Sequence, residues 1–206
     1  MADVDFFFDP ICPWAWITSR WVEEVRTQRG LDVDWRFIAL RIVNEDRDMD
    51  PGHREGQNMG LRLLRVAAAL REKVGREAVG PYYGAVGGAI HVDRRRDDFF
   101  EPEAVKPLLS DLGYDPALGD AALDESWDEL IRSETETALS RTGKDVGTPI
   151  LTFAPPDGPS FFGPVISRVP RGAEALDLWD SVERLARFPG FAELKRSIRE
   201  RPVVER

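Results

Sequence analysis

The stretch Phe8-Asp9-Pro10-Ile11-Cys12-Pro13-Trp14-Ala15-Trp16 decides the fold, because it joins a strand pattern to a helix pattern. Before the cysteine, residues 3–9 are apolar and aromatic and end at a proline, which predicts a short buried strand. After it, apolar residues recur every three or four positions up to Gly30, which predicts an amphipathic helix of about four turns. Pro13 suits the first turn of that helix, where the amide that proline lacks is not used. We therefore expect Cys12 where a strand ends and a helix begins.

This position predicts a reactive sulfur. The free amides and the dipole at a helix N-terminus stabilise an anion, and such a site lowers a cysteine pKa from about 8.5 towards about 7 or below. No acidic residue follows Cys12 before Glu23, and Trp14 and Trp16 supply flat apolar surface beside the sulfur. The alternative is a buried, inert cysteine that acts as a small hydrophobic residue. The setting favours a nucleophile with a lowered pKa.

The rest of the chain predicts three more strands and a long helical segment. Residues 32–40 alternate apolar and polar and then stay apolar, which indicates a second strand. In the roughly 90 residues that follow residue 50, helical stripes recur without a convincing strand pattern. Residues 148–153 and 160–163 flank a stretch rich in proline and glycine, which predicts a hairpin.

Two helices are expected after the hairpin, one over residues 175–185 and a shorter one through Leu194 and Ile198. The strand–helix–strand order at the start favours parallel pairing, and the hairpin adds an antiparallel edge. The sequence therefore predicts an α/β fold with a mixed four-stranded sheet, helices on both faces, and an inserted all-helical subdomain. The expected division is residues 1–50 and 143–206 for the sheet domain and 51–142 for the insertion.

Composition narrows the partners. The 206 residues include 28 Lys and Arg against 37 Asp and Glu, a net charge of −9, which disfavours a protein that coats nucleic acid. The apolar runs are far shorter than a membrane span, and the N-terminus does not resemble an export signal. One cysteine cannot form an internal disulfide, so we expect a reducing cytoplasm. His53, His91 and the cysteine lie far apart in sequence, so no metal site is expected, and His91 is interpreted as a helix-end residue without a role.

A second feature is Gly147-Thr148-Pro149, directly before the third strand pattern. A cis bond is feasible only before proline, and a native cis-proline usually serves a tight turn. Such a turn would present the backbone of Thr148 to a partner's extended chain or thiol. Most Thr-Pro pairs are trans, so this pair becomes informative only together with Cys12.

Together these features resemble the thioredoxin superfamily, and the helical insertion narrows the resemblance to its DsbA-like branch. In particular, the chain is similar to the actinobacterial mycothiol-dependent DsbA-like reductases, cytosolic enzymes that include nitroreductase activators of prodrugs. The resemblance covers nearly the whole chain. The motifs that carry it are residues 8–21, 44–47, 54–56, 145–149, 161–165 and 170–172.

The resemblance implies a thioredoxin-like fold and a thiol nucleophile at Cys12, within the motif Cys12-Pro13-Trp14-Ala15, and a cis-proline loop at Thr148 and Pro149. By position it also makes Trp14, Asn44 and His53 candidate pocket residues, although the family often has tyrosine where His53 stands. The alternatives are a solvated loop histidine for His53 and a turn residue for Asn44. No tightly bound cofactor is implied. The expected co-substrate is a low-molecular-weight thiol, mycothiol or glutathione. The expected partners are an electrophilic or disulfide substrate and, as a further option, a redoxin.

Ala15 departs from the family pattern, which has a second cysteine at this position. In a dithiol enzyme that second thiolate attacks the mixed disulfide and releases the product, and alanine cannot do so. Three interpretations remain open. The chain is a natural monothiol enzyme served by mycothiol or a mycoredoxin, or a form whose second cysteine was replaced to trap an intermediate. Alternatively its lineage uses thiol-cofactor chemistry without a redox cycle, as in kappa-class glutathione transferases and hydroxychromene carboxylate isomerases.

The leading hypothesis is a monothiol oxidoreductase that acts through Cys12. The alternatives are a transferase or isomerase that positions an external thiol, and a binding module that has lost catalysis.

Overall fold

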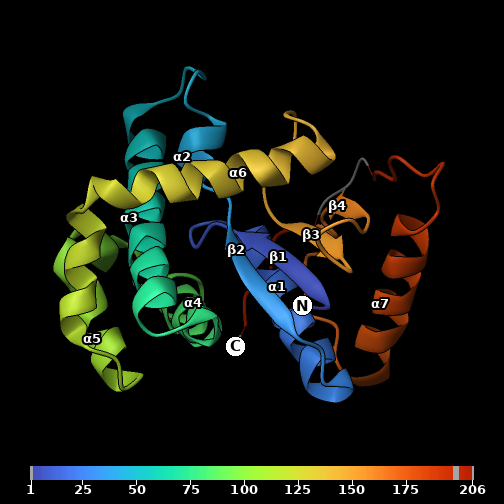
Figure 1. The fold of residues 1–206 in the computed structure, drawn as a ribbon, viewed down its shortest axis with the longest axis horizontal. Helices are drawn as coiled ribbons and strands as arrows, with labels where there is room; N and C mark the ends of the chain where they lie inside the picture. Colours follow the sequence, from blue (N-terminus) through green and yellow to red (C-terminus); the bar gives the residue numbers. More distant parts are fainter. Residues whose placement is uncertain (1, 197–199, 206) are drawn as a thin grey trace.

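A four-stranded mixed sheet forms the centre of the computed structural model, which describes residues 2–196 and 200–205 (Figure 1). The strand order is β2-β1-β3-β4. β1 (Val4–Phe8) pairs parallel with β2 (Val33–Phe37) and antiparallel with β3 (Ile150–Phe153), which pairs antiparallel with β4 (Ser160–Phe162). The predicted mixed sheet, with a parallel pair on one side and a hairpin on the other, is confirmed.

Strand β1 is buried on both faces, which explains its unbroken apolar sequence. Phe6 and Phe8 pack into the main core, where Phe8 stacks on Tyr83 at 3.9 Å between ring centroids. Phe7 points to the opposite face and packs in a second cluster with Ile150 and with Ala138 of the long helix α6.

Helices cover both faces of the sheet (Figure 1). α1 (Pro13–Arg29) and α7 (Gly172–Ala186) lie on the face of the main core, and α6 (Asp128–Thr142) crosses the other. Trp21 of α1 contacts Trp179 of α7, with ring centroids 5.4 Å apart, and donates its Nε1–H to the carbonyl of Ala175 at 2.9 Å. These contacts fix the direction of α1, and with it the position of the cysteine at its start.

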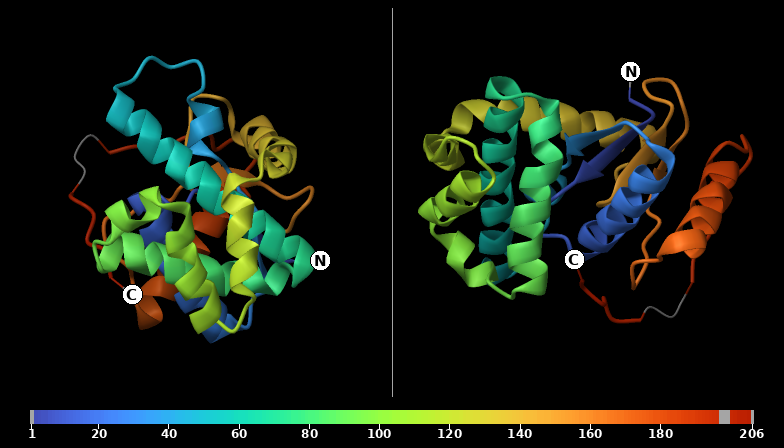
Figure 2. Two further views of the ribbon diagram at one scale, coloured as in Figure 1. Left: turned by 90° about the vertical axis from the view of Figure 1, so that its left-hand side faces the viewer. Right: turned by 90° about the horizontal axis from the view of Figure 1, so that it is seen from below.

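Residues 51–142, here called the helical segment, contain only helices and their connections, as the sequence predicted. Figure 2 shows α3, α4 and α5 stacked beside the sheet. The elements of the segment are α3 (Pro51–Lys73), α4 (Val79–Gly87), a π-helical turn (Gly88–Val92), α5 (Val105–Asp111) and α6, with 3₁₀ turns at Arg76–Ala78, Arg96–Phe100, Pro102–Ala104, Pro116–Leu123 and Glu125–Trp127.

Two regions differ from the sequence prediction. Strand β2 ends at Phe37, and a short helix α2 (Leu40–Val43) begins where the strand was expected to continue. The reason is that the amide of Leu40 donates to the carboxylate of Asp9, at 2.8 Å, rather than to a neighbouring strand. Residues 191–196 form neither helix nor strand, so the expected last helix is absent there, and its Ile198 lies outside the described residues.

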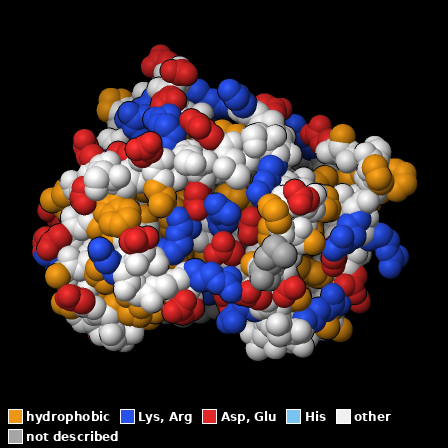
Figure 3. Space-filling model, viewed as in Figure 1, with side chains coloured by type: hydrophobic (Ala, Val, Ile, Leu, Met, Phe, Trp, Pro, Cys, Tyr) orange, Lys and Arg blue, Asp and Glu red, His pale blue; other side chains and the backbone are white. Residues whose placement is uncertain are grey.

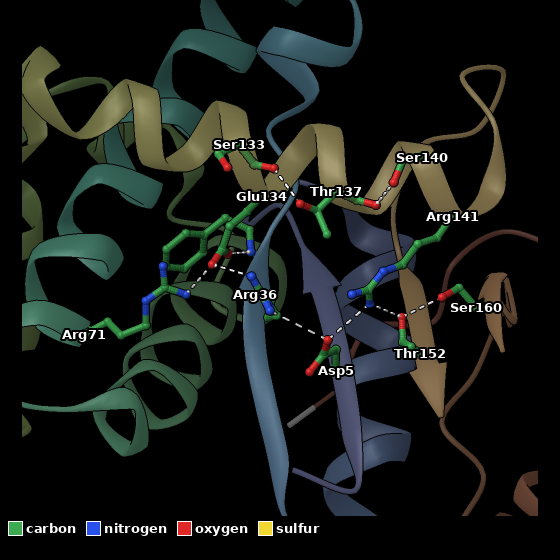
Figure 4. A network of polar contacts seen from close by, with 11 residues as sticks. Asp5, Arg36, Arg71, Ser133, Glu134, Thr137, Ser140, Arg141, Thr152 and Ser160 are labelled. Atoms are coloured by element: carbon green, nitrogen blue, oxygen red, sulfur yellow. Dashed lines mark hydrogen bonds and ion pairs between the residues drawn. The ribbon is translucent and has the colours of Figure 1, made fainter. Parts of the chain in front are cut away.

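A buried polar network fastens α6 to the sheet (Figure 4). Glu134 of α6 pairs with Arg36 of β2 and with Arg71 of α3, each at 2.9 Å. Farther along α6, Arg141 pairs with Asp5 of β1 at 3.3 Å. Because Arg71 belongs to the helical segment, Glu134 links three elements that are distant in sequence.

The face seen in Figure 3 carries acidic and basic side chains interspersed over its whole extent. Ion pairs between exposed side chains are frequent, for example Arg29 with Asp180 and Arg168 with Glu174, each at 2.6 Å. Within the described residues, no helix combines the length and the apolar character that crossing a membrane requires.

Candidate active site

Cys12 caps the N-terminus of α1, at the position that the sequence predicted. Its backbone is extended, with φ −82° and ψ 114°, and Pro13 occupies the first helical position. The amide of Ala15 donates to the Cys12 Sγ at 3.5 Å, as the side chain of a helix cap requires. The amide of Cys12 itself donates to the carbonyl of Asp9 at 3.1 Å, which closes the turn between β1 and α1.

The proline loop faces this sulfur. The Thr148–Pro149 peptide bond has the cis geometry that the sequence made feasible. The Thr148 hydroxyl donates to the carbonyl of Phe7 at 3.0 Å and so ties the loop to β1. The thiol of Cys12 donates to the carbonyl of Thr148, with 3.6 Å between Sγ and oxygen. Two segments far apart in the sequence thereby meet at one sulfur atom.

Burial reverses the acidity expected for Cys12. Only 8% of the residue is exposed, and the loss of water around the sulfur raises the pKa of the thiol to about 11. The amides of Ala15 and Trp14 act in the opposite direction, while the negative charge of Asp9 raises the pKa further. The expectation of a lowered pKa is therefore wrong, because it considered only the helix and not the packing around its first turn. Although no acidic residue follows Cys12 before Glu23, Asp9 precedes the helix, and its charge opposes the anion.

Asp9 is a site residue that the sequence analysis did not single out. Its carboxylate is fully buried and accepts hydrogen bonds from the amides of Ile11 at 3.1 Å and Leu40 at 2.8 Å. Burial raises its pKa to about 6 in spite of these bonds. On the α3 side, Gly60 leaves room for the carboxylate, since a Cβ there would lie 2.7 Å from Oδ1. The sequence signal for Asp9 as a site residue is its position as an acidic residue directly after an apolar strand.

The structure places the two candidate pocket residues on either side of the α2–α3 loop. Asn44 ends α2, and its backbone carbonyl accepts a hydrogen bond from Arg54 of α3 at 3.1 Å. His53 lies in the first turn of α3, where its side chain is 80% exposed and pairs with Asp50. Among the described residues, neither Asn44 nor His53 forms a hydrogen bond or ion pair with Cys12. Their place in a pocket stays a prediction.

Aromatic residues surround the start of α1. Trp14 is half-buried next to the cysteine, and Trp16 is buried with 1% exposure. The imidazole of His91 stacks on Trp16, and its Nε2 lies 2.9 Å from the carbonyl oxygen of Pro10. The interpretation of His91 as a helix-end residue without a role overlooked these contacts. In the described part of the chain, no three His, Cys, Asp or Glu side chains are grouped to hold a metal ion.

Known proteins are similar to this chain over most of its length. Residues 11–196 match the model of the Rv2466c-like family, described as mycothiol-dependent nitroreductase Rv2466c. The uncharacterized protein Rv2286c of Mycobacterium tuberculosis (strain ATCC 25618 / H37Rv) is 34% identical over 197 residues, which span 95% of this chain and 82% of that protein.

Two solved structures share the fold at 16% sequence identity. A putative protein disulfide isomerase from Nitrosomonas europaea superimposes with a TM-score of 0.58, over 87% of this chain and 97% of the other. A 2-hydroxychromene-2-carboxylate isomerase superimposes with a TM-score of 0.54, over 89% and 96%. The fold is thus the thioredoxin-like fold of the DsbA type. Because the family match begins at the cysteine-bearing turn and extends almost to the C-terminus, the chain belongs to the Rv2466c-like family of mycothiol-dependent nitroreductases.

Proposed function

We propose that this protein is a monothiol oxidoreductase in which Cys12 exchanges disulfides with an external low-molecular-weight thiol. The observation that carries the proposal is the sulfur at the start of α1, facing the Thr148 carbonyl beside the cis-proline, in a chain without a second cysteine. Membership of a mycothiol-dependent family favours mycothiol over glutathione as that thiol. A cytoplasmic location follows from the same chemistry, since a free catalytic thiol needs a reducing compartment.

The proposed cycle has two exchange steps. The Cys12 thiolate attacks the mycothiol sulfur of a mixed disulfide, so that a Cys12–mycothiol disulfide forms and the substrate leaves as a thiolate. A second mycothiol thiolate then attacks the mycothiol sulfur of that adduct, which releases mycothiol disulfide and regenerates the Cys12 thiolate. Each step forms one S–S bond and breaks one. The net reaction oxidises one free mycothiol, which leaves as mycothiol disulfide together with the mycothiol unit of the mixed disulfide, and reduces the substrate sulfur to a thiol.

Because the Cys12 sulfur is buried, substrate binding has to expose it before it can react. In the described form the thiol is protonated at neutral pH and donates to the Thr148 carbonyl. We propose that substrate binding opens the surroundings of Sγ, by displacing half-buried Trp14 or the helical segment, and that the proton then leaves to solvent. In this proposal residues 1–50 and 143–206 form a thioredoxin-like domain and residues 51–142 a lid. Asn44, at the end of α2, and His53, in the first turn of the lid, would contact the external thiol.

The test is reduction of a mixed disulfide between mycothiol and a small reporter thiol, with mycothiol as the reductant. We expect the wild-type protein to accelerate release of the reporter thiol, and Cys12→Ser to give only the rate without protein. Lys144→Ala, an exposed substitution in the turn that follows α6, is the control and should keep the wild-type rate. Equal rates for the wild-type protein and Cys12→Ser would refute the proposed role of the sulfur.

The raised pKa of Cys12 favours one second candidate function. A protonated thiol can donate a hydrogen bond to the thiolate of a bound external thiol and so lower the pKa of that thiol. In this role Ala15 would be no loss, because no disulfide to Cys12 forms, and the reaction would be a transfer or isomerisation. Turnover of an aromatic electrophile without oxidation of any thiol, retained in Cys12→Ser, would indicate this function. If the protein shows no turnover and binds no thiol, a binding module is indicated.

A further inference from the structure

His91 connects the helical segment to the turn that carries Cys12. It lies in the π-helical turn Gly88–Val92 that continues α4, and its Nε2 is 2.9 Å from the carbonyl oxygen of Pro10. Because a carbonyl oxygen only accepts hydrogen bonds, Nε2 carries the proton and donates it. Pro10 precedes Cys12 by two residues, so this bond acts directly on the turn between β1 and α1.

The imidazole makes a second contact with the same helix start. Its ring stacks on Trp16, with 5.9 Å between ring centroids and 27° between the planes. Trp16 is one helical turn beyond Cys12, and its amide donates to the Cys12 carbonyl at 3.0 Å. Gly87 lets the α4 backbone approach the indole, since a Cβ there would lie 2.3 Å from the Cε3 of Trp16. His91 therefore touches the chain on both sides of the cysteine.

The protonation state of His91 suits a contact that does not change over the physiological pH range. Burial lowers its pKa to about 4, and the charge of Arg96 acts in the same direction, while the bond to Pro10 acts in the opposite one. The imidazole is thus neutral across the physiological range, with its single proton on Nε2. A π-helical turn departs from regular helix hydrogen bonding, and such turns are frequent at functional sites.

We infer that His91 is a positioning residue. It holds the Pro10–Cys12 turn and so keeps the Cys12 Sγ in contact with the Thr148 carbonyl. The consequence for exchange rests on the proposed function, since placement of the reacting sulfur governs the rate of that reaction. The effect of His91 on the solvent exposure of the Cys12 sulfur does not depend on the proposed function. The helical segment thus contributes to the site through contacts with Pro10 and Trp16, whereas the proline loop contacts Cys12 itself.

Three variants separate the parts of this role. His91→Gln keeps an N–H donor at nearly the reach of Nε2 but removes the ring, and His91→Phe keeps a flat ring but removes the donor. Val92→Ala, the next residue in the same turn and also half-buried, is the matched control. Each is compared in two assays: the pH profile of Cys12 alkylation by iodoacetamide, and the rate of exchange with a mycothiol mixed disulfide. Thermal unfolding of each variant accompanies both assays.

We expect His91→Phe to move the alkylation midpoint by about one unit towards that of a free thiol, because water reaches the loosened turn. Alkylation near pH 7.5 should then be about tenfold faster, whereas exchange should be about tenfold slower because the sulfur is no longer held in place. His91→Gln should restore both properties, and Val92→Ala should change neither. General destabilisation would not produce opposite changes that a donor at residue 91 reverses.

A wild-type alkylation profile in His91→Phe, or a profile in His91→Gln shifted towards that of a free thiol, would overturn the inference. If His91→Phe does not fold, His91→Ala, which removes both the ring and the donor, takes its place: the same shift of the alkylation midpoint towards that of a free thiol is expected, and a wild-type profile would overturn the inference. The alkylation assay contains no mycothiol. If the wild-type protein shows no exchange activity, the proposed function fails, while the alkylation profiles still test the position of the sulfur.

Discussion

The Sγ of Cys12 lies 3.6 Å from the carbonyl oxygen of Thr148, across 136 positions of sequence. The two meet because β1 and β3 are neighbours, with Phe7 paired to Ile150, so that the chain leaves β1 towards the helix where the proline loop enters β3. The contact uses the thiol proton and leaves the sulfur covered. Burial and this contact favour a protonated thiol in the reduced form, and in the proposed function the contact opens before Cys12 reacts.

The first prediction concerns the titration of that thiol. We expect iodoacetamide to alkylate the native protein slowly at neutral pH, with the rate rising to a midpoint at about pH 11, because burial disfavours the thiolate. The measurement is the alkylation rate by intact mass between pH 6 and pH 11.5. The same chain in denaturant is the control and should titrate near the ordinary cysteine value of about 8.5. A native midpoint at or below that value would contradict the prediction.

Asp9→Asn should lower the pKa of Cys12, because the carboxylate is the charge that opposes the thiolate. The substitution should also change the pH dependence of stability. Asp9 has a raised pKa of about 6 in the fold, so its protonated form is favoured there. The contribution of Asp9 to the free energy of unfolding is fully present below about pH 4, the ordinary pKa of aspartate in the unfolded chain. It is lost as the pH rises through about 6, and the total loss is about 3 kcal/mol.

The free energy of unfolding of the wild-type protein and of Asp9→Asn, measured by urea at pH 4 and pH 7, tests this sign. The wild-type protein should lose more stability over this interval than the variant. Asp177→Asn, at an exposed position on α7, should behave like the wild-type protein. Parallel curves for the wild-type protein and Asp9→Asn would show that Asp9 does not titrate in this range.

Ala15→Cys should provide a second thiol that attacks the mixed disulfide at Cys12 and releases the bound mycothiol. Residue 15 is fully buried one turn into α1, and its amide already lies 3.5 Å from the Cys12 Sγ, so a thiol there is close to the first. With mycothiol disulfide, we expect the variant to form an internal disulfide, two mass units lighter, without accumulating a mycothiol adduct. Ala15→Ser is the control for added volume and should behave like the wild-type protein. Accumulation of the adduct on Ala15→Cys would mean that the two sulfurs do not meet.

Glu134→Ala should destabilise the protein by about 3–5 kcal/mol, because it removes the buried carboxylate that pairs with Arg71 and leaves Arg36 only its longer contact with Asp5, at 3.8 Å. It also removes the acceptor of the Phe37 amide, which lies 2.9 Å from the carboxylate. Glu183→Ala breaks an exposed pair with Arg187 and should cost at most about 1 kcal/mol. Chemical denaturation measures the loss in the free energy of unfolding for each variant. Equal losses would contradict a stabilising role of the network in Figure 4.

The sequence predicted the elements whose signals are local. The strand before Asp9, the cap at Cys12 and the helix up to Gly30 follow from apolar spacing, proline at the first helical position and glycine at the end. The acidity of Cys12 did not follow, because it depends on packing from the proline loop and on a carboxylate outside the helix. His91 was missed for a similar reason, since a π-helical turn has no signature in a pattern with a 3.6-residue period.

The most direct test of the central claim is the intact mass of the reduced protein after incubation with mycothiol disulfide at pH 7.5 and pH 9. We expect one mycothiol unit per chain, located on Cys12, with formation faster at the higher pH because more of the thiol is ionised. Free mycothiol should remove the adduct, and Cys12→Ser should form none. A wild-type chain that stays unmodified at both pH values, while the same chain in denaturant takes up the mycothiol unit, would contradict a role of Cys12 in thiol exchange.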